Sequence, residues 1–135
     1  MSRLIVRNRI RQELATFAAA NSVVFHDSID VYLDVTDDTW ITAKFLSDFV
    51  DKNCISGRSI NESGTIEVIV FVKPGHGDAV AVGLCDKLQE HFLITDIDPV
   101  SIDSVTSASE FGAGDASGKY YACSIDISYF YNFTI

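Results

Sequence analysis

The last sixteen residues of the chain, YYACSIDISYFYNFTI, constrain the fold most, because they alternate along their whole length. Every odd-numbered residue from Tyr121 to Ile135 is apolar, which is the period-two pattern of a strand with one buried face. At about 3.3 Å per residue such a strand would reach roughly 50 Å. A compact domain of 135 residues is about 37 Å across. The strand must therefore bend, or its far end must leave the domain.

The two halves of this strand differ. From Tyr121 to Ile127 the alternation is regular, with Ser124 and Asp126 on the outward face, so this half should belong to a sheet. From residue 129 to 133 the chain is aromatic on both faces, which is unusual for the surface strand of a monomer. We expect the second half to bend over the core or to be covered by a neighbouring subunit.

Composition indicates one cytosolic domain covering residues 1–135. The hydrophobic fraction of 47% and the charged fraction of 21% are ordinary for a globular protein. No apolar run approaches the roughly 20 residues of a membrane span, and the arginine-rich start lacks the order of a signal peptide. Cys54, Cys85 and Cys123 are far apart and form no CxxC pair, so we expect three reduced cysteines.

The net charge of -9 is unevenly distributed. Residues 1–11 contain four arginines and no acid, whereas the rest of the chain is strongly acidic. Such a chain is a poor candidate for wrapping DNA, which requires many phosphate neutralisations. Arg3, Arg7 and Arg11 recur at helical spacing and form a basic ridge. The ridge is either a solvated helix face or a contact for an acidic neighbouring subunit.

Hydrophobic periodicity predicts two amphipathic helices, at residues 2–20 and 78–92, and about five strands. The expected strands are residues 23–25, 39–49, 65–72, 101–107 and 121–135, with a short extended piece near 31–35. Residues 50–64 form a long hairpin arm or a loop, and 108–119 a flexible connection. The predicted fold is α+β, in the order α-β-β-β-α-β-β. Both helices pack on one face of a mostly antiparallel sheet.

Two short motifs carry the residue types of a catalytic or phosphate site. His26-Asp27-Ser28 has triad residue types, but neighbours in a strand point to opposite faces, so we interpret it as a polar strand end. Gly75-His76-Gly77 joins a strand to a helix, where a phosphate cradle would lie. The third glycine of a dinucleotide fingerprint is replaced by Val80, so a tight turn is the simpler interpretation.

Metal-ligating patterns are also weak. The acids between residues 27 and 38 are not spaced as in a calcium loop and include no glycine, so we expect a solvated acidic loop. His91 should lie near a helix C-terminus, where it can interact with the last carbonyls. From the residues we therefore predict no catalytic residue, no cofactor and no metal.

The sequence resembles the tail-terminator proteins of long-tailed bacteriophages over most of its length. The resemblance is carried by RNRIRQELATFAAAN, TWITAKFL, GTIEVIVFVKPGHGDAVAVGLCDKLQEHF and YYACSIDISYFY, which follow the family's opening helix, strand, strand-turn-helix and closing strand. The chain departs from the family at DSIDVYLDVTDD, where a Pro/Gly-rich stretch is expected. That departure puts the contacts of this loop in doubt.

The resemblance implies a non-enzymatic virion protein. Such proteins form a ring, typically a hexamer, on the head-proximal end of the tail tube after assembly in the host cytoplasm. The ring ends tube polymerisation and joins the tail to the connector or neck proteins of the head. DNA passes through the lumen without specific binding, and no membrane is involved. The net charge predicts an acidic lumen that repels DNA.

Two alternatives remain open. One is another head-closure, neck or tail-tube subunit; the other is a small-ligand-binding or enzymatic α+β domain that uses the turn at Gly75. The predicted assembly contacts belong to the basic ridge, the arm, the flexible connection and the strand tip. They are Arg3, Arg7, Arg11, Lys52, Arg58, Glu62, Glu110, Phe111, Lys119, Phe130, Tyr131 and Phe133.

Overall fold

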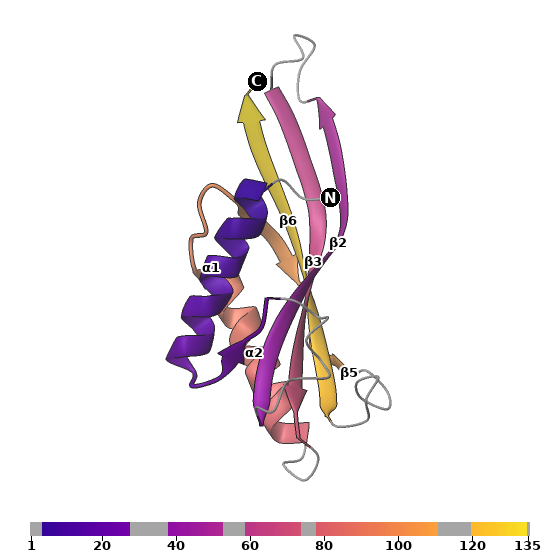
Figure 1. Ribbon diagram of the computed structural model, residues 1–135. Helices are drawn as coiled ribbons and strands as arrows, with labels where there is room; N and C mark the ends of the chain where they lie inside the picture. The colour runs from indigo at the N-terminus through magenta and orange to yellow at the C-terminus, as the bar shows by residue number, and fades with distance from the viewer. Residues whose placement is uncertain (1–3, 28–37, 53–58, 74–77, 111–119, 135) are drawn as a thin grey trace.

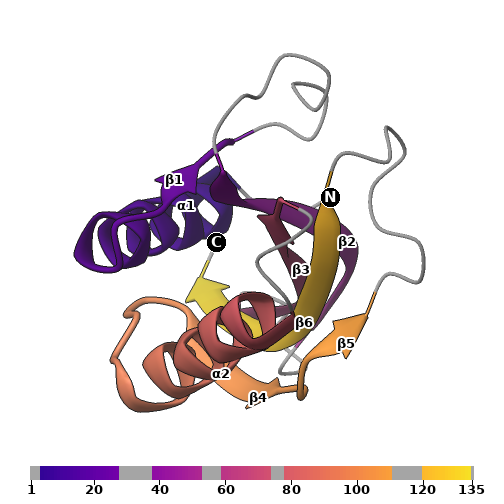
Figure 2. The ribbon, with the colours of Figure 1, turned by 90° about the horizontal axis from the view of Figure 1, so that it is seen from below.

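The computed structural model describes residues 4–27, 38–52, 59–73, 78–110 and 120–134. Within these residues the chain has the predicted α+β fold, with two helices on one face of a mainly antiparallel sheet. Figure 1 shows both helices on the same side of the long strands, and Figure 2 shows them side by side against a strongly curved sheet. The predicted extended piece at 31–35 and the glycine turn at 75–77 lie outside the described residues.

Helix α1, Leu4–Ala20, buries the apolar stripe that the sequence predicts. Val6, Ile10 and Leu14 are fully buried against the sheet, because spacings of four residues keep them on one side of the helix. The helix ends where predicted: the Asn21 side chain donates to the Phe17 carbonyl at 2.9 Å, and Ser22 has a left-handed backbone (φ 57°).

Helix α2, Asp78–Ile94, is two residues longer than predicted. Its predicted stripe is buried in the same core as that of α1; its members are Ala81, Leu84, Cys85, Leu88 and Phe92. Burial beside Cys123 raises the pKa of the Cys85 thiol to about 12. Neither cysteine forms a disulfide and both are buried, so they pack as small apolar residues, as expected.

The sheet has the strand order β1-β2-β3-β6-β4, and β5 also pairs with β6. The strands are β1 (Val24–Phe25), β2 (Thr39–Lys52), β3 (Ser59–Val72), β4 (Ser101–Val105), β5 (Ser109–Glu110) and β6 (Tyr121–Thr134). Only β1 and β2 are parallel. Strand β5 was not predicted, because residues 108–119 contain no apolar alternation. Strand β3 is central, as its apolar run TIEVIVFV indicates.

Both faces of β3 are covered. Ile66, Val68 and Val70 face the helices and belong to the main core. Ile69 and Phe71 face the other way and join a second buried cluster with Trp40, Tyr120 and Ala122. The Trp40 ring stacks on the Phe71 ring, with centroids 4.2 Å apart.

Strands β2, β3 and β6 are each 14 residues long and outrun the helical layer. Strand β3 begins six residues before the predicted start, at Ser59 rather than Thr65. Its polar first half is held by pairing on both sides, opposite β2 and opposite β6. Most of the predicted arm at 50–64 is thus strand, and the three strands continue past the N-terminal end of α1 (Figure 1).

Candidate assembly surface

The three-stranded extension, formed by residues 47–52 of β2, 59–65 of β3 and 128–134 of β6, is the feature that most distinguishes this sheet. Strand β4 reaches only as far as Phe130, so the end of β6 continues beyond it. The first half of β6 belongs to the helix-covered sheet, and its second half leaves that layer as part of the extension (Figure 1).

The outer edge of β2 has little pairing within the described residues. Val24 and Phe25 pair with Trp40 and Ile41, and the His26 amide donates to the Ile41 carbonyl at 2.9 Å. Beyond Ile41 no described strand pairs with the outer side of β2. A bulge between Phe45 and Ser47 turns the strand at Leu46, whose side chain is 45% exposed. An open edge of this length is a template for pairing with another chain.

The arginine ridge lies over this edge. The guanidinium carbons of Arg7 and Arg11 lie 4.7 and 5.6 Å from the centroid of the Phe45 ring on β2. The Nε atom of Arg11 also lies 2.7 Å from a carboxylate oxygen of Asp27. Both arginines are half-buried. The ridge is therefore partly used within the subunit, and Arg3 lies outside the described residues.

The terminal aromatic residues lie on opposite faces. Tyr131 is half-buried on the helix side, packs against the main core, and stacks on Phe133 with centroids 5.4 Å apart. Phe130 points to the other face and is 37% exposed. Of these three residues, Phe130 is thus the most open to a partner.

Glu62 is a correction to the predicted assembly contacts. We expected it on an exposed arm, but its side chain is fully buried in the single chain. The reason is the early start of β3, which places Glu62 in register with Val50 and Tyr131 on the helix side of the sheet. It is therefore not available to a neighbouring subunit.

The remaining predicted contacts are only partly placed. Lys52 ends β2 opposite Ile60, and Glu110 lies in β5 opposite Cys123, but their side chains lie outside the described part of the structure. The other three lie wholly outside the described residues; they are Arg58, Phe111 and Lys119.

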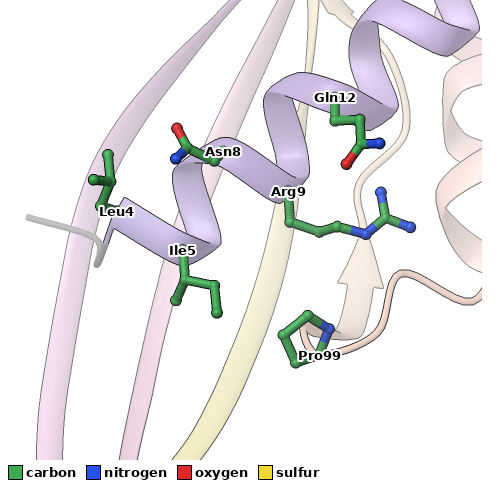
Figure 3. Close-up of a pocket in the computed structure, with 6 residues that line it drawn as sticks. All are labelled: Leu4, Ile5, Asn8, Arg9, Gln12 and Pro99. Atoms are coloured by element: carbon green, nitrogen blue, oxygen red, sulfur yellow. The ribbon is translucent and has the colours of Figure 1, made fainter.

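The opposite side of the sheet is acidic. Residues 95–110, which lead into and include β4 and β5, contain four acids and no basic residue. Asp96, Asp98 and Asp103 are exposed. An open depression of about 440 Å³ lies beside this segment, between Pro99 and the start of α1 (Figure 3). Its lining includes Leu4, which is 68% exposed, so an apolar surface borders the acidic one.

A polar cluster that the sequence did not reveal joins the two helices. Glu13 on α1 accepts a hydrogen bond from Arg9 at 2.7 Å, and its other carboxylate oxygen lies 2.6 Å from Nε2 of His91 on α2. Burial of Glu13 pushes its pKa up, but the contacts with Arg9 and His91 outweigh burial and hold the pKa below its usual value. Arg9 also donates to the Asp98 carbonyl at 3.2 Å.

The position of His91 corrects the expectation that it interacts with the last carbonyls of its helix. Its ring points across to α1, where it lies edge-on to Phe17 at 5.6 Å and meets the Glu13 carboxylate. The cluster holds α1, α2 and the segment before β4 together, which is a structural arrangement.

His26 and Asp27 of the triad-like motif turn apart, as predicted. The His26 ring lies edge-on to Trp40, with centroids 5.2 Å apart, on the face away from the helices. The Asp27 carboxylate pairs with Arg11 on the helix side. Ser28 lies outside the described residues.

A row of charged residues crosses the face away from the helices. Lys44, Glu67 and Asp126 are cross-strand neighbours on β2, β3 and β6. Burial raises the pKa of the Glu67 carboxyl, the charge of Asp126 raises it further, and Lys44 partly offsets both. In the described part of the chain, no group of three or more His, Cys, Asp or Glu side chains could hold a metal ion.

No protein-family model matches the chain, and no curated protein matches it significantly. Neither described helix is long and apolar enough to cross a membrane. The interpretation of the surface therefore depends on its own geometry.

Proposed function

We propose that this chain is a non-enzymatic virion subunit that forms a ring on the head-proximal end of a phage tail tube. In this role it ends tube polymerisation and offers the surface on which the head is joined. The observation that carries the proposal is the three-stranded extension, whose β2 edge has no described partner from Ala43 to Lys52.

A monomer gains little from such an extension. Long open edges and exposed apolar side chains on a strand invite pairing with other chains, and monomeric proteins usually shorten, cover or charge them. Here Leu46 and Val50 on the open strand are 45% and 53% exposed. Pairing with other subunits gives both the edge and these side chains a use.

The charge distribution supports a head-to-tail ring more than a dimer in which like surfaces meet. A heterologous contact uses two different patches on each subunit and closes into a ring when the rotation closes. The start of the chain is basic, with four arginines and no acid in residues 1–11, whereas residues 95–110 contain four acids and no basic residue. Opposite charges on these two segments favour head-to-tail contact and disfavour contact between like segments.

The chain resembles tail-terminator proteins in the order of its elements and in its residue pattern. From this resemblance we infer that its partners are the tail tube and the head connector. The runner-up is another neck, head-closure or tube subunit of the same machine. Its strand extension would serve assembly equally well, so the two roles differ in what the ring does to a growing tube.

The test adds the purified protein to polymerising tail-tube subunits and measures tube length by electron microscopy. A terminator should shorten and cap the tubes in proportion to its concentration, with a ring visible at one end. Tubes that grow longer and incorporate the protein would instead indicate a tube subunit. A His76→Ala variant that loses an enzymatic activity while still assembling would overturn the non-enzymatic proposal.

A further inference from the structure

We propose that copies of this chain join by sheet continuation, in which the open edge of β2 in one copy pairs with β4 of the next. This inference rests on the proposed ring and names its interface. The partner is a second copy, because the two edges of the same sheet match in level and strand direction.

The two edges lie at the same level of the sheet. Phe45 on β2 is in the same row as Val105 on β4, through Ile66 and Ile127. Phe49 is likewise in the row of Ser101. Residues 45–49 of one copy can therefore continue the sheet beyond residues 101–105 of the next without a shift along the strands. A contact without such a shift favours a closed ring over a helical filament.

The strand directions also match. Each neighbouring pair in the series β2, β3, β6 and β4 is antiparallel, so β2 runs opposite to β4. Rotation about an axis along the strands preserves these directions and places the β2 strand of one copy antiparallel to the β4 strand of the next. Antiparallel pairing is the slightly more stable arrangement. Pairing of β2 with the exposed end of β6 would instead be parallel.

Strand β4 has room for this pairing at its first residues. The Gln89 side chain on α2 donates to the Val105 carbonyl at 3.2 Å and to the Thr106 carbonyl at 3.1 Å. These bonds cover the end of β4 and leave Ser101–Ser104 without a described strand on their outer side. Gln89 thus limits the register that an incoming β2 strand can adopt.

Exposed apolar side chains lie beside both edges. The β4 side has the depression at Leu4, Ile5 and Pro99 (Figure 3), and the β2 side has the exposed side chains of Leu46 and Val50. A head-to-tail contact brings these two apolar surfaces together.

Cysteine cross-linking tests the interface directly. The variant carries Leu46→Cys and Ser104→Cys with Cys54→Ser, since Cys85 and Cys123 are buried. Within one subunit the two new cysteines are separated by three strand spacings, about 14 Å, which is too far for a disulfide. Any disulfide between them must link two copies. The matched control pairs Val80→Cys with Ser104→Cys, again with Cys54→Ser, because Val80 is 41% exposed but lies on α2, near Thr39 at the start of β2 and outside residues 43–52.

We expect oxidised rings of the test variant to give a ladder of covalent multimers on a non-reducing gel, which reductant collapses to monomer. The control variant should remain monomeric on the same gel. Rings that form, by light scattering, without a ladder would overturn the β2–β4 interface and leave the proposed function standing. Wild-type protein that forms no ring, alone or with tail tubes, would overturn both the interface and the proposed function.

A second variant covers the case in which the cysteine variant does not assemble. Leu46→Lys adds a charge to the open edge, which discourages strand pairing. It should abolish rings with little change in melting temperature, because the Leu46 side chain is already 45% exposed. Val80→Lys should leave rings intact. Rings that persist with Leu46→Lys would contradict the inference.

Discussion

The carboxylate of Glu13 lies 2.6 Å from Nε2 of His91, although 78 residues separate them in the sequence. Glu13 is only 7% exposed and is also held by Arg9. This contact joins α1 to α2, which also meet where the Phe17 ring packs against the His91 ring. The relative position of the helices therefore depends on a buried charged group with all its partners in place.

Replacing Glu13 with Gln should lower the free energy of unfolding by about 1–3 kcal/mol, because a buried charged contact is lost and its partners remain. The pKa of Glu13 is lowered in the folded state, so its contribution is complete above the unfolded value of 4.5. It is lost as the pH falls through the folded pKa. Denaturant unfolding over this range should therefore show a flatter pH profile for Glu13→Gln than for the wild type.

Glu90→Gln is the matched control, since Glu90 is exposed on α2. It should change neither the stability at neutral pH nor the acid limb of the profile. An unchanged acid limb in Glu13→Gln would show that the contact with His91 contributes nothing to folding.

Much of the fold was predictable because local patterns dominate it. The stripes at Val6, Ile10 and Leu14 and at Ala81, Leu84 and Leu88 predict both helices, and the apolar run ending at Val72 predicts the central strand. The first half of β3 was missed because its residues are polar and its pairing partners are distant in sequence. The contact between Glu13 and His91 was missed for a similar reason, as no local spacing encodes it.

The candidate surface was predictable only in part. The length of the alternating terminal strand predicted that it would bend or that its end would leave the body of the domain, and the aromatic residues marked that end. Sequence alone could not show that Glu62 turns inward, because the register of a strand decides its face. Nor could it show that, among the described strands, none pairs with the outer side of β2 beyond Ile41, which is a property of the strand order.

Glu67 should be mildly unfavourable at neutral pH. Asp126 is its cross-strand neighbour, and burial and this charge raise the pKa of Glu67. The folded state therefore holds the proton more tightly than the unfolded state, and stability is lost as the pH rises from 4.5 through the folded pKa. Glu67→Gln should add a few tenths up to about 1 kcal/mol at neutral pH, the scale of a cross-strand like-charge pair.

Thermal unfolding of Glu67→Gln at acidic and neutral pH measures this effect. The gain should vanish at low pH, where the wild-type carboxyl is protonated. A variant that melts below the wild type at neutral pH would show that the Lys44 contact outweighs the repulsion from Asp126.

Substitutions of Arg11 and of its partner Asp27 can show whether the basic ridge acts only within the subunit or also in assembly. The side chains are 31% and 61% exposed, so their ion pair should contribute at most about 1 kcal/mol. Arg11→Gln and Asp27→Asn should therefore change the melting temperature similarly and slightly. If the arginine contacts an acidic neighbour, only Arg11→Gln should reduce the yield of rings by light scattering, and added salt should narrow the difference. Equal ring yields from both variants would restrict Arg11 to its internal role.

The terminal aromatic residues should divide between assembly and folding. Deleting 130–135 would also remove the strand that pairs with the first half of β3, so single substitutions are the cleaner test. Tyr131→Ala should cost about 1–3 kcal/mol of unfolding free energy, because the ring packs against the core and stacks on Phe133. Phe130→Ser should change stability by less than about 0.5 kcal/mol, since the ring is 37% exposed on the other face.

The effects on assembly should be the reverse of those on stability, with Phe130→Ser impairing assembly more than Tyr131→Ala. If a neighbouring subunit or the tail tube covers the Phe130 ring, Phe130→Ser should reduce ring formation or tube capping while the melting temperature stays near that of the wild type. Tyr131→Ala should assemble once it is folded, at a temperature well below its own melting point. Normal rings and normal capping by Phe130→Ser would show that this end of β6 serves only the packing of its own subunit.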